Sequence, residues 1–482
     1  MSQESRVRKS GVADSRLSTK KGLSTKMKGG STRAMAKLTG IDIYKLLPKT
    51  NCGDCNFPTC MAFAMQVATK KAALDQCPHV SEEAQLALGE AQAPPMRTVK
   101  IGTGETELVT GGETVLFRHE EKFHHPTGIA IKVTDTLTSE ELDARIAQID
   151  RLRFVRVGEE IGVDLVAVEH QEADATRYAE TVKRVKEQTK LPLVLLCPDP
   201  NALAPALEAA ADGRPLIWAA THDNWEEMAS LAVQHKVPLA VRAENLETLA
   251  ELTGKIKAKG VEDLVLDPAG ADLVDGLTKL SLLRRLALEK VFRPLGYPTL
   301  AFAGGESPQA EAAAATAYIC RYGGIVVMNG VESWEVLPLL TVRQNIYTDP
   351  QVPNAIEAKL YETGNPGPDA PVLFTTNFAL TYFTVAGEVE NSKVAAYISV
   401  IDTEGLGVLN AYADDKLTAE KVIKTVKEQG AMERVNHNKL IIPGLVAVLR
   451  MEIQEDSGWE VIVGPEDAAG IPRFLKTEWS PN

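Results

Sequence analysis

The 482-residue chain has no long hydrophobic run and no apolar N-terminal segment of the signal-peptide type. A membrane-spanning helix needs about 20 consecutive apolar residues, and no stretch of the sequence approaches that length. We therefore expect no membrane segment and no export, and hence a cytoplasmic protein. The net charge of −13, and a basic N-terminus without interleaved aromatic residues, argue against nucleic acid as a partner.

Cysteine is scarce as well, with six residues in the whole chain, but four of them gather in one short motif. The motif reads C-x2-C-x4-C-x16-C and consists of Cys52, Cys55, Cys60 and Cys77. Because disulfides are rare in a reducing cytosol, the motif predicts either a zinc ion or an iron–sulfur cluster held by four thiolates.

The cysteine spacing favours the iron–sulfur cluster. Structural zinc sites usually consist of two C-x2-C pairs, whereas here three cysteines lie together and the fourth is distant. Gly53 permits a tight turn between the first two thiolates, Pro78 follows the fourth as in many ferredoxins, and residues 59–74 read as a helix. We expect a [4Fe–4S] cluster, with zinc as the alternative. The two remaining cysteines lie in apolar runs and are expected to be buried free thiols: Cys197 and Cys320.

The predicted fold class is α/β, with three folded domains. Residues 1–37 carry ten Lys or Arg and two acidic residues, and we expect a disordered basic extension there. The further predicted segments are a cluster domain at 38–92, a TIM (β/α)8 barrel at 93–360, a Gly/Pro-rich linker at 361–371 and a small open α/β domain at 372–482.

The barrel prediction rests on short apolar runs that alternate with amphipathic helical stretches. This alternation predicts a parallel sheet, and eight units over about 215 residues have the size of a TIM barrel. We expect residues 113–126 to form a hairpin that closes the bottom or edge of the barrel. The apolar runs lie at 129–133, 163–168, 191–196, 215–220, 237–241, 262–267, 297–302 and 324–328.

Polar residues at the carboxyl ends of these strands form one candidate site. They include no obvious catalytic triad or metal-ligand set, so a partner-binding mouth stays open beside a catalytic one. The residues are Glu169, His170, Asp199, His222, Arg242, Asp267, Gly304 and Gly305.

The C-terminal domain offers a second candidate site, because ligands of open parallel sheets bind outside the carboxyl ends of the strands. Its strands are expected at 372–376, 394–401, 439–443 and 459–464. The loops that follow them are small, glycine-bearing and poor in charge, and no G-x-G-x-x-G follows any strand. This favours a broad, largely uncharged ligand over a nucleotide phosphate, although ordinary turn chemistry explains the same residue types.

With these parts, the chain resembles the large (gamma) subunits of the corrinoid iron–sulfur proteins and acetyl-CoA decarbonylase/synthase complexes of the acetyl-CoA (Wood–Ljungdahl) pathway. The resemblance runs from residue 38 to the end and rests on NCGDCNFPTC…CP, GGETVLFRHEEKFHHPTG, FTTNFALTYFTVAGEVE and TEGLGVLNAYA. It implies that the four cysteines ligate a [4Fe–4S] cluster and that the C-terminal domain binds a corrinoid (cobamide). The corrinoid contacts that it implies are Thr375, Thr381, Gly405, Leu406, Gly407, Val408 and Ala469.

The resemblance also implies a function as corrinoid methyl carrier, a methyltransferase subunit in the broad sense. Co(I) of the cofactor would take a methyl group from methyltetrahydrofolate through a separate methyltransferase and deliver it to acetyl-CoA synthase/CO dehydrogenase. The cluster would reduce accidentally formed Co(II), and a small barrel subunit would complete a heterodimer. No catalytic side chain is implied, because the cobalt is the nucleophile.

The sequence lacks the D-x-H-x-x-G motif whose histidine coordinates cobalt in many cobamide-binding modules. His437 is the only histidine after residue 235, so we expect a corrinoid without a protein histidine ligand. A cobalt without that donor is easier to reduce. Two alternatives remain open: a pterin-binding barrel that transfers the methyl group by itself, and an electron-transfer subunit without corrinoid.

Overall fold

The computed structural model describes residues 40–68, 71–72, 74–81, 94–172 and 174–481. The chain divides into two compact units, Met1–Ala91 and Gln92–Asn482. The basic extension predicted at 1–37 lies outside the described residues. The domain boundary predicted between residues 92 and 93 lies outside them as well. Within the described part, no helix has the length and apolar character needed to cross a membrane.

The first unit consists of α1 (Gly40–Leu46), α2 (Cys60–Ala68) and the 3-10 turn η1 (Leu74–Gln76). α2 begins on the third cysteine of the motif, and its apolar face buries Phe63 and Val67. Both side chains pack with Ile43 of α1 in one core. The helix predicted over 59–74 is therefore confirmed for its first half, whereas Leu74 and its neighbours form the separate turn η1.

The second unit begins with a closed barrel of eight parallel strands, as the sequence predicts. The strand order is β10-β9-β8-β7-β6-β3-β12-β11, and a bridge between Leu266 and Thr299 joins the two ends. The strands are β3 (Gly128–Thr134), β6 (Leu165–Glu169), β7 (Leu193–Leu196), β8 (Leu216–Ala220), β9 (Leu239–Arg242), β10 (Leu264–Asp267), β11 (Leu300–Phe302) and β12 (Ile325–Met328).

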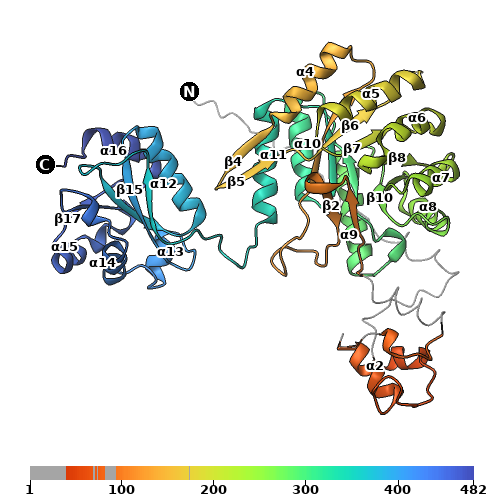
Figure 1. Ribbon diagram of the computed structural model, residues 1–482, viewed down its shortest axis with the longest axis horizontal. Coiled ribbons are helices and arrows are strands. Elements are labelled where there is room, and N and C mark those ends of the chain that lie inside the picture. The colour runs from red at the N-terminus through yellow and green to blue at the C-terminus, as the bar shows by residue number, and fades with distance from the viewer. Residues whose placement is uncertain (1–39, 69–70, 73, 82–93, 173, 482) are drawn as a thin grey trace, which may run out of the picture. The chain divides into compact units, whose positions relative to one another are not determined.

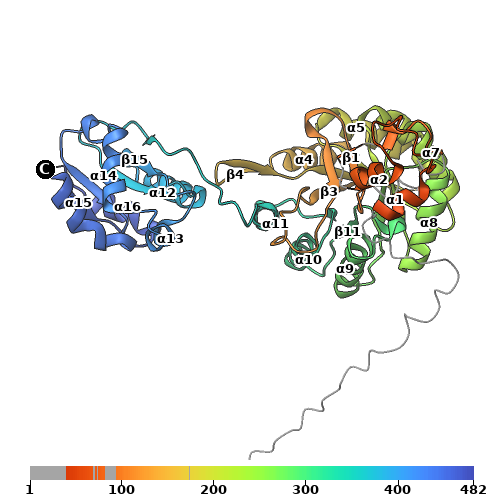
Figure 2. The ribbon, with the colours of Figure 1, turned by 90° about the horizontal axis from the view of Figure 1, so that it is seen from below.

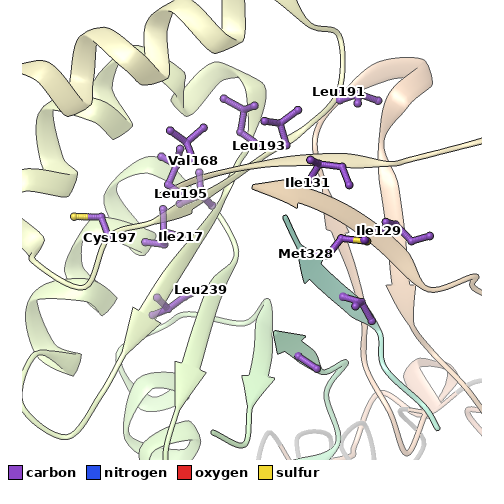
Figure 3. Packing of buried hydrophobic residues seen from close by; sticks show 14 of the residues in the cluster. Ile129, Ile131, Val168, Leu191, Leu193, Leu195, Cys197, Ile217, Leu239 and Met328 are labelled. Atoms are coloured by element: carbon purple, nitrogen blue, oxygen red, sulfur yellow. The ribbon is translucent and has the colours of Figure 1, made fainter. Parts of the chain in front are cut away.

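Helices surround these strands (Figure 2). They are α4 (Ser139–Asp150), α5 (Ala175–Gln188), α6 (Pro200–Ala210), α7 (Trp225–His235), α8 (Leu246–Ala258), α9 (Leu273–Leu288), α10 (Pro308–Cys320) and α11 (Ser333–Tyr347). Side chains of β7 alternate, because Leu193 and Leu195 pack outward against helices while Val194 and Leu196 fill the barrel interior. Figure 3 shows the outward layer around Leu193 and Leu195.

The two cysteines of the barrel differ in exposure. Cys197 is fully buried in the outward layer (Figure 3), and burial raises its thiol pKa to about 12, so the prediction of an inert buried thiol is confirmed. Cys320 is exposed, so the same prediction is wrong there. Cys320 is the last residue of α10, one position beyond the buried Ile319, and that step turns it away from the core.

A hairpin does close one end of the barrel, but the predicted location is wrong. The hairpin consists of β1 (Thr98–Ile101) and β2 (Leu108–Gly111), and Val99 and Ile101 pack against the barrel interior. Residues 113–126, where the sequence suggested the hairpin, contain no strand and follow β2 as an irregular segment. A further hairpin that the sequence did not predict is formed by β4 (Arg153–Arg156) and β5 (Glu159–Gly162).

The C-terminal domain is an open sheet with the order β13-β15-β14-β16-β17. Its strands are β13 (Leu360–Thr363), β14 (Val372–Thr376), β15 (Ala396–Ile401), β16 (Lys439–Ile442) and β17 (Glu460–Val463). Its helices are α12 (Ala379–Ser392), α13 (Val408–Ala413), α14 (Ala419–Glu428), α15 (Arg450–Ser457) and α16 (Ile471–Thr477). α12 and α16 cover one face of the sheet and α13, α14 and α15 the other (Figure 1).

The predicted linker at 361–371 needs a correction. β13 occupies its start and pairs antiparallel with β15, with Leu360 opposite Ser399. Residues before β13 also belong to this sheet, because Ile356 N–H donates to Asn377 O at 2.9 Å. The Gly/Pro content near residue 366 misled the prediction, since it marks the turn after an edge strand rather than a free tether.

Candidate functional site

The four loops expected to form a ligand site meet at one edge of the C-terminal sheet. β14, β15, β16 and β17 are mutually parallel, so their carboxyl ends lie at the same edge. Each strand is followed directly by a loop and a helical turn. The structure therefore brings together the loops that the sequence selected from four distant segments.

Thr375 and Thr376 close β14 with two hydroxyl groups that lack any partner. Thr375 is 1% exposed and Thr376 is fully buried, and neither Oγ1 makes a hydrogen bond. More than nine in ten buried polar groups in proteins are hydrogen-bonded. Two adjacent exceptions at the carboxyl edge of the sheet make this strand end a candidate ligand site.

Thr381 and the Gly405–Val408 stretch lie side by side. Thr381 Oγ1 is 3.7 Å from the position that a Cβ on Gly407 would take. Gly407 is the residue before α13, whose first residue Val408 is buried. Beside Thr381, burial raises the phenol pKa of Tyr382 to about 12, so that side chain stays neutral. Two of the predicted contacts, Thr381 of α12 and Gly407 at the start of α13, are therefore neighbours in space.

Asn377 organises the loop after β15, a role that the sequence did not reveal. Its Oδ1 accepts hydrogen bonds from Thr403 N at 2.9 Å, Thr403 Oγ1 at 3.0 Å and Gly405 N at 2.9 Å. Its Nδ2 donates to Asp402 Oδ1 at 3.0 Å. One buried amide therefore fixes the backbone from residue 402 to Gly405. An Asn directly after a strand was the available signal, but its partners lie 25 to 28 residues away.

The loops after β16 and β17 pack against each other. Gly444 N–H donates to Pro465 O at 3.0 Å, and a Cβ on Gly444 would stand 2.6 Å from Gly464 O. Ala469, the predicted contact of the last loop, is exposed, and its N–H donates to Asp467 Oδ1 at 3.0 Å. A side chain at position 444 would collide with Gly464 O. The two loops can therefore pack this closely only with a glycine at that position.

Large apolar side chains stand exposed around this edge. They belong to the start of α12, to α13 and to the turn η6 (Gly444–Leu449) after β16, and they are between 38% and 67% exposed. Soluble proteins rarely leave such side chains grouped without a ligand or partner. The residues are Leu380, Leu409, Tyr412, Leu445 and Val448.

His437 lies at the opposite edge of the sheet. It precedes β16, and its Nε2 bonds to Ala370 O at 2.9 Å, just before β14. Its Nδ1 accepts from Lys439 N at 3.1 Å, and its ring packs on Trp479. Both ring nitrogens are therefore occupied, away from the carboxyl ends of the strands.

The cysteine module buries three of its four thiols. Cys55, Cys60 and Cys77 belong to one core with Ile43 and Phe63, whereas Cys52 is exposed. Three positive φ angles shape the loop that carries the first two thiols: Asn51 at 51°, Gly53 at 83° and Asn56 at 64°. The tight turn expected at Gly53 is confirmed, since Asn56 N–H donates to Gly53 O at 2.9 Å.

Two further side chains lie beside Cys52 that the sequence did not select. One donor atom each of Cys52, Asp54 and His79 lie within 4.8 Å of one another, and His79 Nε2 is 2.7 Å from Asp54 Oδ2. The hydrogen bond from His79 lowers the pKa of Asp54. Among the described residues this is the one group of three donors so closely spaced, and the four thiols do not form such a group.

The mouth of the barrel is occupied by an internal polar network. A cavity of about 250 Å³ there is lined by Trp218, Arg242 and Asp267. Asp267 accepts from Trp218 Nε1 at 2.9 Å, Arg242 at 2.6 Å and Ala269 N at 2.9 Å. Both carboxylate oxygens thus accept internal donors, and Glu169, another predicted candidate, lines the same cavity.

The other barrel candidates are dispersed. His170 Nδ1 pairs with the buried Asp135 at 2.6 Å, Asp199 caps the N-terminus of α6, and His222 is exposed beside Asp223. Each has a local role, and the structure gathers no triad from them.

A family model described as CO dehydrogenase/acetyl-CoA synthase delta subunit matches residues 98–475. The chain belongs to this family. A second family model, described as "Putative Fe-S cluster", matches residues 47–79 and so contains all four clustered cysteines. The family therefore spans the barrel and the C-terminal domain, and the cysteine module has a separate match.

Curated relatives of the family match nearly the whole chain. The corrinoid/iron-sulfur protein large subunit of Moorella thermoacetica is 46% identical over 91% of this chain and 98% of its own length. The acetyl-CoA decarbonylase/synthase complex subunit gamma of Methanothermobacter thermautotrophicus is 38% identical, with the same coverage. Among solved structures, dihydropteroate synthase from Xanthomonas albilineans matches 48% of this chain and 99% of its own, at 18% identity and a TM-score of 0.36.

Proposed function

We propose that this chain is a corrinoid methyl carrier of the acetyl-CoA pathway. It would receive a methyl group from methyltetrahydrofolate through a separate methyltransferase and deliver it to acetyl-CoA synthase. The observation that carries the proposal is the buried, unpartnered hydroxyl of Thr375 at the glycine-rich edge of the C-terminal sheet. The Moorella relative is named for a corrinoid, which supports that group as the ligand of this edge.

The edge suits a broad, mostly uncharged macrocycle. Thr375 and Thr381 would offer hydroxyl groups, and the Gly405–Val408 stretch and Ala469 would line the same edge. The exposed apolar side chains at the rim would lie against the ring and exclude water. When bound, the corrinoid would supply a cobalt that is nucleophilic in its reduced state.

The position of His437 supports a cofactor bound without a protein histidine. Both of its ring nitrogens bond to backbone at the amino edge of the sheet, whereas the candidate site lies at the carboxyl edge. The chain would thus leave the lower side of the metal without a strong donor, which favours the reduced state.

We further propose that Cys52, Cys55, Cys60 and Cys77 hold a [4Fe–4S] cluster that returns the oxidised cobalt to its active state. The match of residues 47–79 to a family model described as "Putative Fe-S cluster" supports the cluster over zinc. Three buried thiols in an apolar core also suit a redox centre, because burial tunes its potential.

The barrel would serve as a scaffold and partner surface rather than as a pterin-binding catalyst. Its central carboxylate, Asp267, is held by Trp218, Arg242 and a backbone N–H, so it would serve the internal structure of the barrel. The chain would act together with a small subunit, as the name of the Moorella relative suggests, and not as a stand-alone methyltransferase.

Anaerobic purification followed by cobalt, iron and zinc analysis and by visible spectroscopy tests this proposal. We expect one corrinoid and about four iron atoms per chain, with corrinoid lost in Thr375→Val and retained in the exposed control Thr384→Val. A protein without cobalt would favour the electron-transfer alternative. Methyl transfer from methyltetrahydrofolate to free cobalamin by this chain alone would favour the pterin-binding alternative.

A further inference from the structure

We infer that Thr376 is a second buried hydroxyl contact of the ligand, so that the ligand reaches both faces of the sheet at the end of β14. The inference rests on the proposed corrinoid function and deepens it. The family resemblance does not imply Thr376 as a contact. The contacts that it implies on β14 and α12, Thr375 and Thr381, lie on the other face of the sheet.

The first observation is the burial of an unpaired polar atom. Thr376 is fully buried, its Oγ1 has no hydrogen-bond partner, and it pairs with Ile401 at the carboxyl end of β15. Leaving a buried hydroxyl without a partner is unfavourable, because its lost hydrogen bonds to water are not replaced. Such a cost is retained at a binding edge when the ligand supplies the missing partner.

The second observation is the direction of the side chain. Successive side chains of a strand point to opposite faces. Leu373, two positions before Thr375, packs in the core with α12 and α16. Phe374, two positions before Thr376, packs in the core with α13 and α15. The unpaired hydroxyl of Thr375 therefore lies on the α12 and α16 face of β14, and that of Thr376 lies on the α13 and α15 face.

The third observation is that the nearby polar side chains are already engaged. Asn377 is bonded to Asp402, Thr403 and Gly405. Thr403 Oγ1 donates to Leu406 O at 2.8 Å, and Asp402 Oδ1 also accepts from Glu404 N at 3.0 Å. None of these groups is bonded to Thr376, so its hydroxyl is available to a ligand.

A carboxamide is the chemical group that fits this hydroxyl. It can donate and accept hydrogen bonds without a charge, and the side chains packed around Phe374 and Leu373 on the two faces are apolar. Cobamides carry several carboxamide arms around the corrin ring, so one arm can enter on the Thr376 face while others meet Thr375.

The experiment measures cobamide binding and apo-protein stability for the full chain and its variants. Thr376→Val keeps the shape and removes the hydroxyl, Thr376→Ser keeps the hydroxyl, and Thr384→Val is an exposed control. Affinity is measured by the change in visible absorption on titration with a cobamide, and stability by thermal unfolding of the cobamide-free chain. We expect Thr376→Val to weaken binding about tenfold, with Thr376→Ser and the control close to wild type.

The apo protein separates a ligand contact from a structural role. Without ligand, Thr376→Val should melt at the wild-type temperature or above it, because the substitution removes an unpaired buried hydroxyl. A lower melting temperature would overturn the inference, since the hydroxyl would then have a partner within the protein. Unchanged affinity of Thr376→Val, or an equal loss in Thr376→Ser, would also overturn it.

The same titration distinguishes a failure of the inference on Thr376 from a failure of the proposed function. If wild type binds and Thr375→Val loses cobamide while Thr376→Val does not, the corrinoid proposal stands and the inference on Thr376 fails. If wild type itself binds no cobamide, the proposed function fails.

Discussion

Asn377 has more structural influence than any predicted contact residue in the C-terminal domain. It is 5% exposed, and its amide joins the end of β14 to the loop that contains Gly405. Three donors converge on Oδ1 while Nδ2 donates to a carboxylate. The position therefore requires a side chain that accepts at one atom and donates at the other, which only an amide of this length provides.

We expect Asn377→Asp to destabilise the chain by about 1–3 kcal/mol in free energy of unfolding. The new carboxylate would keep the acceptor but would face the carboxylate of Asp402 where an N–H donor now stands. Urea denaturation measures the effect. Asn391→Asp serves as control, because Asn391 is exposed and has one long contact to Glu388. Equal stability of both variants would contradict the role assigned to Asn377.

A matched pair of glycines separates backbone conformation from close packing. Gly405 has a φ of 77° and Gly458 a φ of 76°, but a Cβ on Gly405 would lie 2.7 Å from Pro353 Cβ, whereas nothing lies within 4 Å of one on Gly458. We expect Gly458→Ala to cost about 1–2 kcal/mol from the left-handed conformation alone. Gly405→Ala should cost more and should lower the cobalt content per chain. Similar losses for both variants in urea denaturation would show that the contact with Pro353 is unimportant.

At the scale of elements, residues 113–126 form an irregular segment, and the buried Arg284 is one of the side chains that hold it to the barrel. Arg284 of α9 donates to Val115 O at 2.7 Å and pairs with Glu113 at 3.3 Å. Its guanidinium also lies over the rings of Phe123 and Tyr322. Burial lowers the pKa of Arg284, and the nearby Glu113 carboxylate opposes that shift.

We expect Arg284→Met to destabilise the chain by about 3–5 kcal/mol, because Glu113 would be left as a buried charge without its partner. The double variant Glu113→Gln with Arg284→Met should regain part of that loss. Hydrogen exchange should show faster opening of residues 113–126 in the single variant. If the double variant is less stable than the single one, the segment depends on hydrogen bonds of Glu113 to His124 N and His125 N more than on charge.

At the scale of the whole molecule, the cysteine module and the C-terminal site belong to separate compact units. Each unit has its own core, that of the module being built around Phe63 and Ile43. Damage to the module should therefore leave the C-terminal fold intact, and the proposed repair and carrier roles should be separable by mutation.

We expect Cys77→Ser to abolish reductive reactivation of oxidised cobalt while sparing methyl transfer from protein that has been chemically reduced beforehand. The two activities are measured on the same preparation, with Cys197→Ser as a matched thiol control outside the module. Loss of corrinoid binding in Cys77→Ser, or normal reactivation by it, would contradict the separation of roles.

Periodicity predicted the strands well and the hairpins poorly. All eight barrel strands lie within the predicted apolar runs or within a residue of them, because a strand buried on both faces needs a continuous apolar segment. The short edge strands β1, β4 and β13 escaped, since each is partly exposed and its sequence resembles a loop. Cys320 was misjudged for a related reason: one step around α10 separates it from the buried Ile319.

The sequence by itself determined the architecture and the cysteine motif, because these depend on residue order and spacing. Only the tertiary structure decided which polar groups of the carboxyl edge are satisfied. The bonds from Asn377 to Thr403 and Gly405, and the unpaired hydroxyls of Thr375 and Thr376, join or separate atoms on different strands. Such pairings depend on strand order and side-chain direction, and no local pattern of residues encodes them.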